Sequence, residues 1–284
     1  MSEAADVFEM ALSISTNGGY FYRLLGLYDL EKALGLFEKA ADLYVKENNQ
    51  KYASYTYMIV AQISLFLKKE NSLTYYDKAA ECCREKDPER SARIYEILIN
   101  KCLKNDNKEN AAKYSELCGN VWECDLKNIS KSTKFYHQAA ELYLKSGLTE
   151  NSNRAFLKAA ENYALDKEYI TAFKIYEKMG MTNLNDTNKS YKEYFFKASL
   201  LTLCDKCLKT SESLDQYFVD AKDLEQSHEF VLIENILQSR EKGKMDIFYT
   251  AVREFSSAHE MDEVTRFLLI KIRELFEHEI YGFI

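Results

Sequence analysis

Proline is almost missing from this chain, which has one proline and nine glycines among 284 residues. Average usage would give about 14 prolines, and all-β and α/β folds place proline and glycine at their many turns. The chain also lacks any apolar run close to the ~18 residues that a membrane-spanning helix needs. These shortages predict an all-helical protein with short connections and no membrane span.

Positive charge is in deficit too, because 45 acidic residues outnumber 38 basic ones and the net charge is −7. The segment 1–199 is balanced, so the excess lies entirely in 200–284. An acidic chain argues against a broad nucleic-acid-binding surface. Seven cysteines, an odd number, without a recognisable secretion signal predict free thiols and a cytoplasmic location.

One pattern recurs about every 20 residues: an aromatic residue, a small pair three positions later and often a second aromatic. We call this pattern the octet. Positions i, i+3, i+4 and i+7 share one helix face, so each octet predicts an apolar stripe whose small pair lets a neighbouring helix approach closely. The lead residues of the clear copies are Phe37, Tyr76, Tyr136 and Phe156, and Phe195 leads a degraded copy. At the positions between these copies where the spacing predicts further leads stand Tyr57, Tyr95 and Tyr176. The copy near residue 115 lacks its lead aromatic.

Nine octets in register predict nine antiparallel helices that stack as hairpins, because each hairpin can bury its stripe only against its neighbours. The fold class is therefore predicted to be all-α, a TPR-like array of antiparallel helical hairpins that forms a twisted sheet. We expect the array over residues 1–199 and an acidic helical bundle over 200–284 that caps its end. Asp87 and Pro88 are predicted to begin one of the helices as N-cap and first residue.

The sequence shows no phosphate-binding glycine loop, no paired histidines at metal spacing and no nucleophile elbow. Cys204 and Cys207 have the spacing of half a zinc site, but no second pair accompanies them. We therefore predict no enzyme activity, no cofactor and no metal. An enzyme that uses this cysteine pair is the rival interpretation, and stoichiometric zinc would favour it.

Residues 18–28, GGYFYRLLGLY, are apolar without an opposite polar face. The segment either packs on the first hairpin or forms an exposed loop that enters a bilayer interface or grips a partner. Such a short, weakly charged loop would bind membranes only together with another attachment. The residues that would make this contact are Phe21, Tyr22, Leu24 and Leu25.

Several motifs resemble one known family. Residues 175–180 (IYEKMG) and 191–198 (YKEYFFKA) look like the YEQVG…AKDYFFKAAL signature of the soluble N-ethylmaleimide-sensitive factor attachment proteins of the alpha type. Asp87-Pro88 and the segment 111–114 (AAKY) match two further family motifs, and the similarity runs from about residue 18 to 275.

The resemblance implies an adaptor in vesicle trafficking that binds the SNARE four-helix complex left after membrane fusion and recruits the hexameric AAA+ ATPase that disassembles it. The family uses basic residues on its concave face against the acidic SNARE bundle. The matching positions in this chain are Lys113 and Arg154, with Arg84 and Lys192 as weaker candidates.

The resemblance also implies roles for the two ends of the chain. Phe21, Tyr22, Leu24 and Leu25 fall where the family keeps its membrane-attachment loop, which implies peripheral association with membranes. The acidic C-terminal part would contact the N-domains of the ATPase. The tail departs from the family's acidic, leucine-containing end, although two glutamates remain, and the candidate contacts are Asp205, Glu241, Glu277 and Glu279.

Two other interpretations remain open among binding proteins. The chain could be a different TPR-like scaffold, either a gamma-type attachment protein or a chaperone co-factor. A basic carboxylate-clamp pattern in each repeat would favour the co-factor, and the sequence shows none. A purely structural oligomer would self-associate without binding SNAREs.

Overall fold

The computed structural model describes residues 2–16, 30–184, 190–205, 208 and 210–282. The chain divides into two compact units, residues 1–149 and 150–284. The predicted boundary after residue 199 marks the end of the octet pattern and lies within the second unit.

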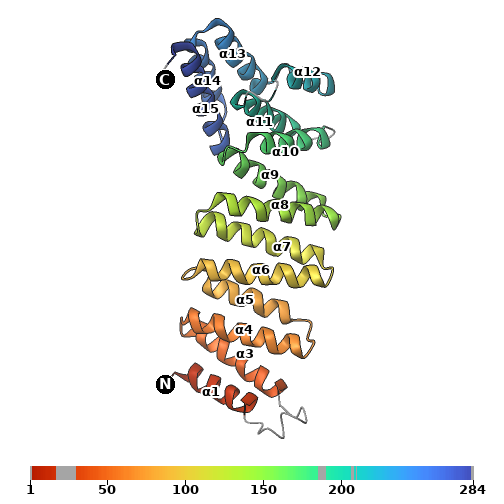
Figure 1. Ribbon diagram of the computed structural model, residues 1–284, viewed down its shortest axis with the longest axis vertical. Helices are drawn as coiled ribbons and strands as arrows, with labels where there is room; N and C mark the ends of the chain where they lie inside the picture. The colour runs from red at the N-terminus through yellow and green to blue at the C-terminus, as the bar shows by residue number, and fades with distance from the viewer. Residues whose placement is uncertain (1, 17–29, 185–189, 206–207, 209, 283–284) are drawn as a thin grey trace. The chain divides into compact units, whose positions relative to one another are not determined.

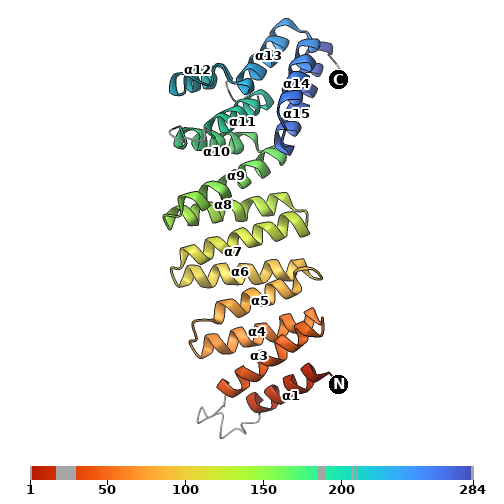
Figure 2. The same ribbon diagram turned by 180° about the vertical axis from the view of Figure 1, so that it is seen from behind.

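The first unit is a stack of helices in which each helix packs beside the next along the chain (Figure 1). Figure 2 shows the same stacking from behind. Its elements are α1 (Glu3–Thr16), α3 (Leu30–Lys46), α4 (Gln50–Phe66), α5 (Ser72–Arg84), α6 (Pro88–Lys104), α7 (Lys108–Asn120), the π-helix η1 (Val121–Asp125) and α8 (Ile129–Lys145).

The octets account for the packing. In the described residues each octet falls on its own helix, from α3 to α11, and the two residues three and four positions after its lead are buried. In α3, for example, Phe37, Ala40, Ala41 and Tyr44 are all buried and form the face that meets the neighbouring helices. The predicted all-helical fold with hairpin packing is confirmed.

The hairpins place every second helix in the same layer. The Tyr75 hydroxyl of α5 donates to Glu38 Oε1 of α3 at 2.6 Å, and Lys113 Nζ of α7 lies 3.8 Å from an Asp77 oxygen of α5. These contacts join α3, α5 and α7 laterally. In the other layer the guanidinium of Arg90 on α6 lies 3.5 Å from the ring centroid of a tyrosine on α4.

Short capped turns separate the helices. The Asp87 side chain accepts a hydrogen bond from the Arg90 backbone N–H at 3.1 Å, and Pro88 is the first residue of α6, as predicted. Asn107 and Asn128 cap α7 and α8 in the same way. Side-chain caps of this kind satisfy backbone donors that the first helical turn leaves unpaired.

The π-helix lies at the one octet that lacks its lead aromatic. It follows α7 directly and carries Trp122, whose ring lies 3.9 Å from Lys131 Nζ of α8. Inside the same region Gly119 lets Tyr136 pack closely, because a Cβ at Gly119 would lie 3.2 Å from that ring. The octet that lacks its lead aromatic therefore keeps its trailing ring, Trp122, on the π-helix, and its Gly119 lets Tyr136 of α8 pack closely.

The second unit contains the last octet helices and the C-terminal bundle around one apolar core. Phe195 is fully buried between Gly180 of α10 and the ring of Tyr217, whose centroid is 4.2 Å away. In this unit α11 packs against α12, α13 and α15. The elements are α9 (Thr149–Leu165), α10 (Tyr169–Thr182), α11 (Tyr191–Cys204), α12 (Thr210–Asp220), α13 (His228–Lys242), α14 (Met245–Ala258) and α15 (Glu263–Tyr281).

Candidate functional site

Lys113 lies on α7 with 56% of its side chain exposed. Its ammonium group is 3.8 Å from an oxygen of Asp77 on α5 and 5.5 Å from the ring centroid of Tyr114. Burial raises the pKa of Asp77 above its ordinary value, and the positive charge of Lys113 opposes that rise. The lysine therefore has one weak partner at the surface and keeps most of its charge accessible to a ligand.

Arg84 is held within its own unit. Its Nε donates to Asp125 Oδ2 at 2.6 Å, and its terminal nitrogen donates to Asn120 Oδ1. The guanidinium thus ties the end of α5 to the π-helix and to the end of α7. A partner would compete with these contacts for the charge of Arg84.

The other two predicted basic residues lie in the second unit. Arg154 is on α9 and is exposed. Lys192, near the start of α11, is only 22% exposed, and its Nζ lies 3.0 Å from Asp223 Oδ2. Lys113 and Arg154 are thus exposed, and Arg84 and Lys192 are half-buried.

The predicted membrane residues Phe21, Tyr22, Leu24 and Leu25 lie outside the described residues. The helices on either side, α1 and α3, pack against each other through Phe8 and Phe37, whose ring centroids are 5.3 Å apart. None of the helices in the described part of the chain is long and apolar enough to cross a membrane.

The predicted acidic residues lie at or near the C-terminal ends of three helices in the second unit. Asp205 is the C-cap of α11 and Glu279 is in the last turn of α15, and both line one pocket of about 320 Å³. Arg240 of α13 donates two hydrogen bonds to Glu279, both at 2.9 Å. The structure thus brings Asp205 and Glu279 together, with part of the negative charge neutralised by an arginine.

Glu277 and Glu241 complete the predicted acidic set. Glu277 accepts a hydrogen bond of 2.5 Å from the Tyr249 hydroxyl of α14, and Arg273 Nε lies 3.9 Å from it. Glu241 is exposed near the end of α13 and has no ion pair within the described residues. Of the four, Glu241 is therefore the carboxylate whose full charge is most available to a partner.

Sequence reasoning missed a buried ion cluster. Lys197 of α11 is only 5% exposed, and its Nζ lies 2.7 Å from Glu193 and 2.8 Å from Asp262. Burial alone would lower the pKa of Lys197, but the two carboxylates outweigh it and raise the pKa above its ordinary value. No sequence pattern marks this cluster, because a lysine on a helix is normally solvated.

Of the two cysteines in the rival enzyme interpretation, Cys204 lies within the described residues. Cys204 is held in α11 with its Sγ 3.9 Å from the Leu268 carbonyl oxygen, and burial raises the pKa of its thiol to about 12. Cys207 lies outside the described residues. Among the residues described, no three His, Cys, Asp or Glu side chains are grouped as metal ligands.

Comparison with known proteins matches almost the whole chain. The family model "Soluble NSF attachment protein, SNAP" matches residues 2–277. The human "Alpha-soluble NSF attachment protein" is 25% identical over 274 residues, which cover 95% of this chain and 92% of that protein. The protein of the same name from Saccharomyces cerevisiae is 25% identical over 281 residues, which cover 96% and 87%. A fowlpox virus "Soluble NSF attachment protein homolog" is 23% identical over 263 residues, which cover 88% and 89%. The chain therefore belongs to the soluble NSF attachment protein family.

Proposed function

We propose that this protein is an adaptor of vesicle fusion that binds the assembled SNARE four-helix complex and recruits the hexameric AAA+ ATPase that takes the complex apart. The family match over residues 2–277 carries this proposal. The relatives are named for attachment to that ATPase, and the match spans both units, so both contacts can be assigned to this chain.

The SNARE contact is assigned to Lys113 and Arg154. Both are exposed, and their charge suits the acidic surface expected of a SNARE bundle. Each exposed ion pair contributes less than about 1 kcal/mol. Contacts repeated along the array would therefore set register and association rate more than affinity. Arg84 and Lys192 are assigned supporting roles because their side chains are less exposed than those of Lys113 and Arg154.

The ATPase contact is assigned to the acidic end of the second unit, formed by Asp205, Glu241, Glu277 and Glu279. Glu241 is exposed and, in the described residues, without an ion pair, so its charge is available for a basic patch on the ATPase. Membrane contact is assigned to the segment that holds Phe21, Tyr22, Leu24 and Leu25, and it would make the protein a peripheral membrane protein.

A pull-down with a preassembled SNARE four-helix complex tests the first contact. We expect salt-sensitive binding by the wild type and its loss in the double variant Lys113→Glu/Arg154→Glu. The matched control is Lys86→Glu/Lys174→Glu, which makes the same change in net charge at two exposed lysines, one in each unit. Equal losses in both double variants would refute the assigned site.

A separate binding experiment tests the ATPase contact. We expect Glu241→Lys to weaken binding of the ATPase N-domains without affecting SNARE binding. Glu225→Lys, at an exposed position before α13, is the control with the same charge change. Unchanged binding by Glu241→Lys would remove this carboxylate from the proposed contact.

A further inference from the structure

Three neighbouring hollows follow the hairpin of α13 and α14 in the second unit. They have volumes of about 510 Å³, 250 Å³ and 300 Å³. The first two share Phe255, and the second and third share Asn235, Ala251 and Glu254. Neighbouring hollows share lining residues and so lie next to one another along the hairpin, and we call the three together the α13–α14 groove.

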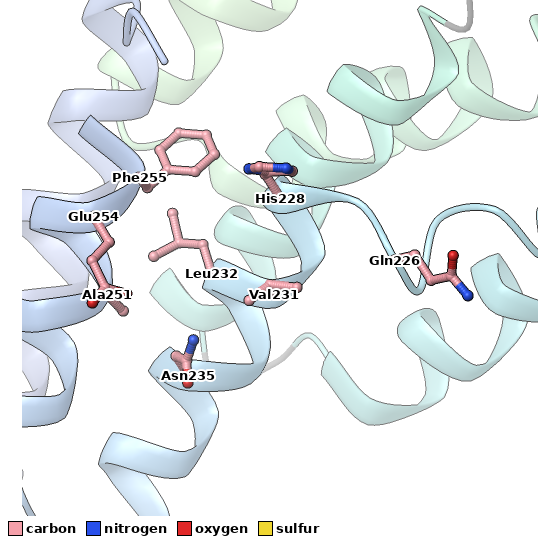
Figure 3. A pocket seen from close by; sticks show the side chains of 8 residues that line it. All are labelled: Gln226, His228, Val231, Leu232, Asn235, Ala251, Glu254 and Phe255. Atoms are coloured by element: carbon pink, nitrogen blue, oxygen red, sulfur yellow. The ribbon is translucent and has the colours of Figure 1, made fainter. Parts of the chain in front are cut away.

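The floor of the groove is apolar. In its middle section the side chains of Leu232 and Phe255 lie between the two helices, with Ala251 beside them (Figure 3). Leu232 and Ala251 are buried, but Val231, which also lines this section, is 45% exposed. An exposed branched side chain beside a hollow is a position where a partner can bury further apolar area.

The rim of the groove is acidic. Glu229, Asp246, Glu254 and Glu260 line the three hollows, and within the described residues none of them forms an ion pair. Two further carboxylates at one end are already paired with the buried ammonium group of Lys197. Arg266 also lines the largest of these three hollows and offsets part of this charge, but four unpaired carboxylates against one arginine leave the rim with a net negative charge.

A histidine at one end provides an unused polar atom. The ring of His259 stacks on Phe255 with centroids 4.7 Å apart and meets the ring of His228 at 4.9 Å. His259 lines the largest hollow, and its Nδ1 is buried without a hydrogen-bond partner in the described structure. Buried polar atoms are normally satisfied, so this residue leaves an unmet hydrogen-bonding capacity next to the hollow.

We propose that the α13–α14 groove binds an amphipathic helix of a partner protein, with an apolar stripe on the groove floor and lysines or arginines against the acidic rim. The groove runs along α14, whose 14 residues span about 21 Å, so it fits a helix of about four turns. Apolar anchors at helical spacing are the recognised means by which a helix occupies such a groove.

The proposal goes beyond the SNARE and ATPase contacts and does not depend on them. The probe is a fluorescent helical peptide of about four turns with a leucine stripe flanked by lysines. A second peptide carries glutamates in place of the lysines. Anisotropy titrations against the full-length protein should give saturable, salt-sensitive binding of the lysine peptide and much weaker binding of the glutamate peptide.

Two variants place the binding in the groove. Val231→Lys puts a charge on the floor and should weaken the lysine peptide about tenfold or more. Glu254→Lys should weaken it at low salt and should strengthen binding of the glutamate peptide. The controls are Ile270→Lys, at an exposed apolar position on α15, and Glu234→Lys, at an exposed carboxylate on α13; neither residue lines the groove.

The peptide titrations of these variants decide whether the groove binds the peptide. Weaker binding of the lysine peptide by Val231→Lys, its unchanged binding by Ile270→Lys, and a shift of Glu254→Lys toward the glutamate peptide would support the groove. Equal affinity for the two peptides, or equal losses in groove and control variants, would overturn it. Circular dichroism of each variant confirms folding, and the exposure of Val231 and Glu254 makes unfolding unexpected.

Discussion

Replacing Gly180 with alanine tests whether the small pairs of the octets mark close approach between helices. A Cβ at Gly180 of α10 would lie 2.4 Å from one carbon of the Phe195 ring and 2.6 Å from another. Phe195 is fully buried and stacks on Tyr217, so its ring has little room to move. The change should therefore force two packed helices apart.

The expected magnitude follows from two opposing effects. Overpacking of a core costs about 1–3 kcal/mol, whereas alanine in place of glycine inside a helix stabilises it by about 0.5–1 kcal/mol. We expect a net loss of about 1–2 kcal/mol for Gly180→Ala. Gly35→Ala is the matched control, because Gly35 lies inside α3 with no atom within 4 Å of the new Cβ, so only the gain should remain.

Amide hydrogen exchange in α10 and α11 is the appropriate assay, because the chain has two compact units and need not unfold in one step. Gly180→Ala should speed exchange in these two helices, and Phe195→Leu in the same chain should restore part of the protection. If Gly180→Ala instead slows amide exchange in α10 as much as Gly35→Ala slows it in α3, the small pairs of the octets do not mark close approach between helices.

Three further predictions concern single side chains. Tyr75→Phe removes the hydrogen bond to Glu38 and should destabilise the first unit by about 1 kcal/mol in urea unfolding. Burial, and after it this hydrogen bond, raises the pKa of Tyr75 to about 12. The raised pKa contributes stability that is fully present below pH ~10, the pKa of an unfolded tyrosine, and is lost as the pH rises through 12. Unfolding of the wild type at a series of pH values should show this loss of stability, and Tyr75→Phe should reduce it. Lys197→Met removes the charged hydrogen bonds to Glu193 and Asp262, which are 59% and 43% exposed and can be rehydrated, so it should cost about 1–3 kcal/mol, measured as a lower unfolding midpoint of the second unit. Cys124 is exposed and should react with a thiol reagent at pH 8, whereas Cys204, with a pKa of about 12, should stay protected until the unit unfolds; equal rates would contradict the burial of Cys204.

The helices could be predicted from the sequence because the octet is a local signal. Positions i, i+3, i+4 and i+7 share one helix face whatever surrounds them, so Phe37 and Tyr76 marked helices that the structure confirms. The π-helix could not be predicted in the same way. Its position was marked only by a missing aromatic near residue 115, and a missing ring does not distinguish a π-helix from a continuing α-helix.

The candidate sites were less accessible to sequence reasoning, because ion pairs form between segments far apart in the chain. Arg84 reaches Asp125, 41 positions later, and Lys197 reaches Asp262, 65 positions later. No periodicity encodes such pairs. Sequence reasoning therefore named Arg84 only as a weaker SNARE-binding candidate and did not single out Lys197, whereas both hold elements of their own unit together.

Reconstituted SNARE disassembly tests the adaptor proposal most directly. The assay contains the preassembled SNARE complex, the hexameric ATPase and ATP, and it measures release of one SNARE helix with and without this protein. We predict release only when the wild-type protein is present, loss of release with Lys113→Glu/Arg154→Glu, and full release with Lys86→Glu/Lys174→Glu. Release at the same rate without the protein, or no release with the folded wild type across several SNARE sets, would contradict the proposed function.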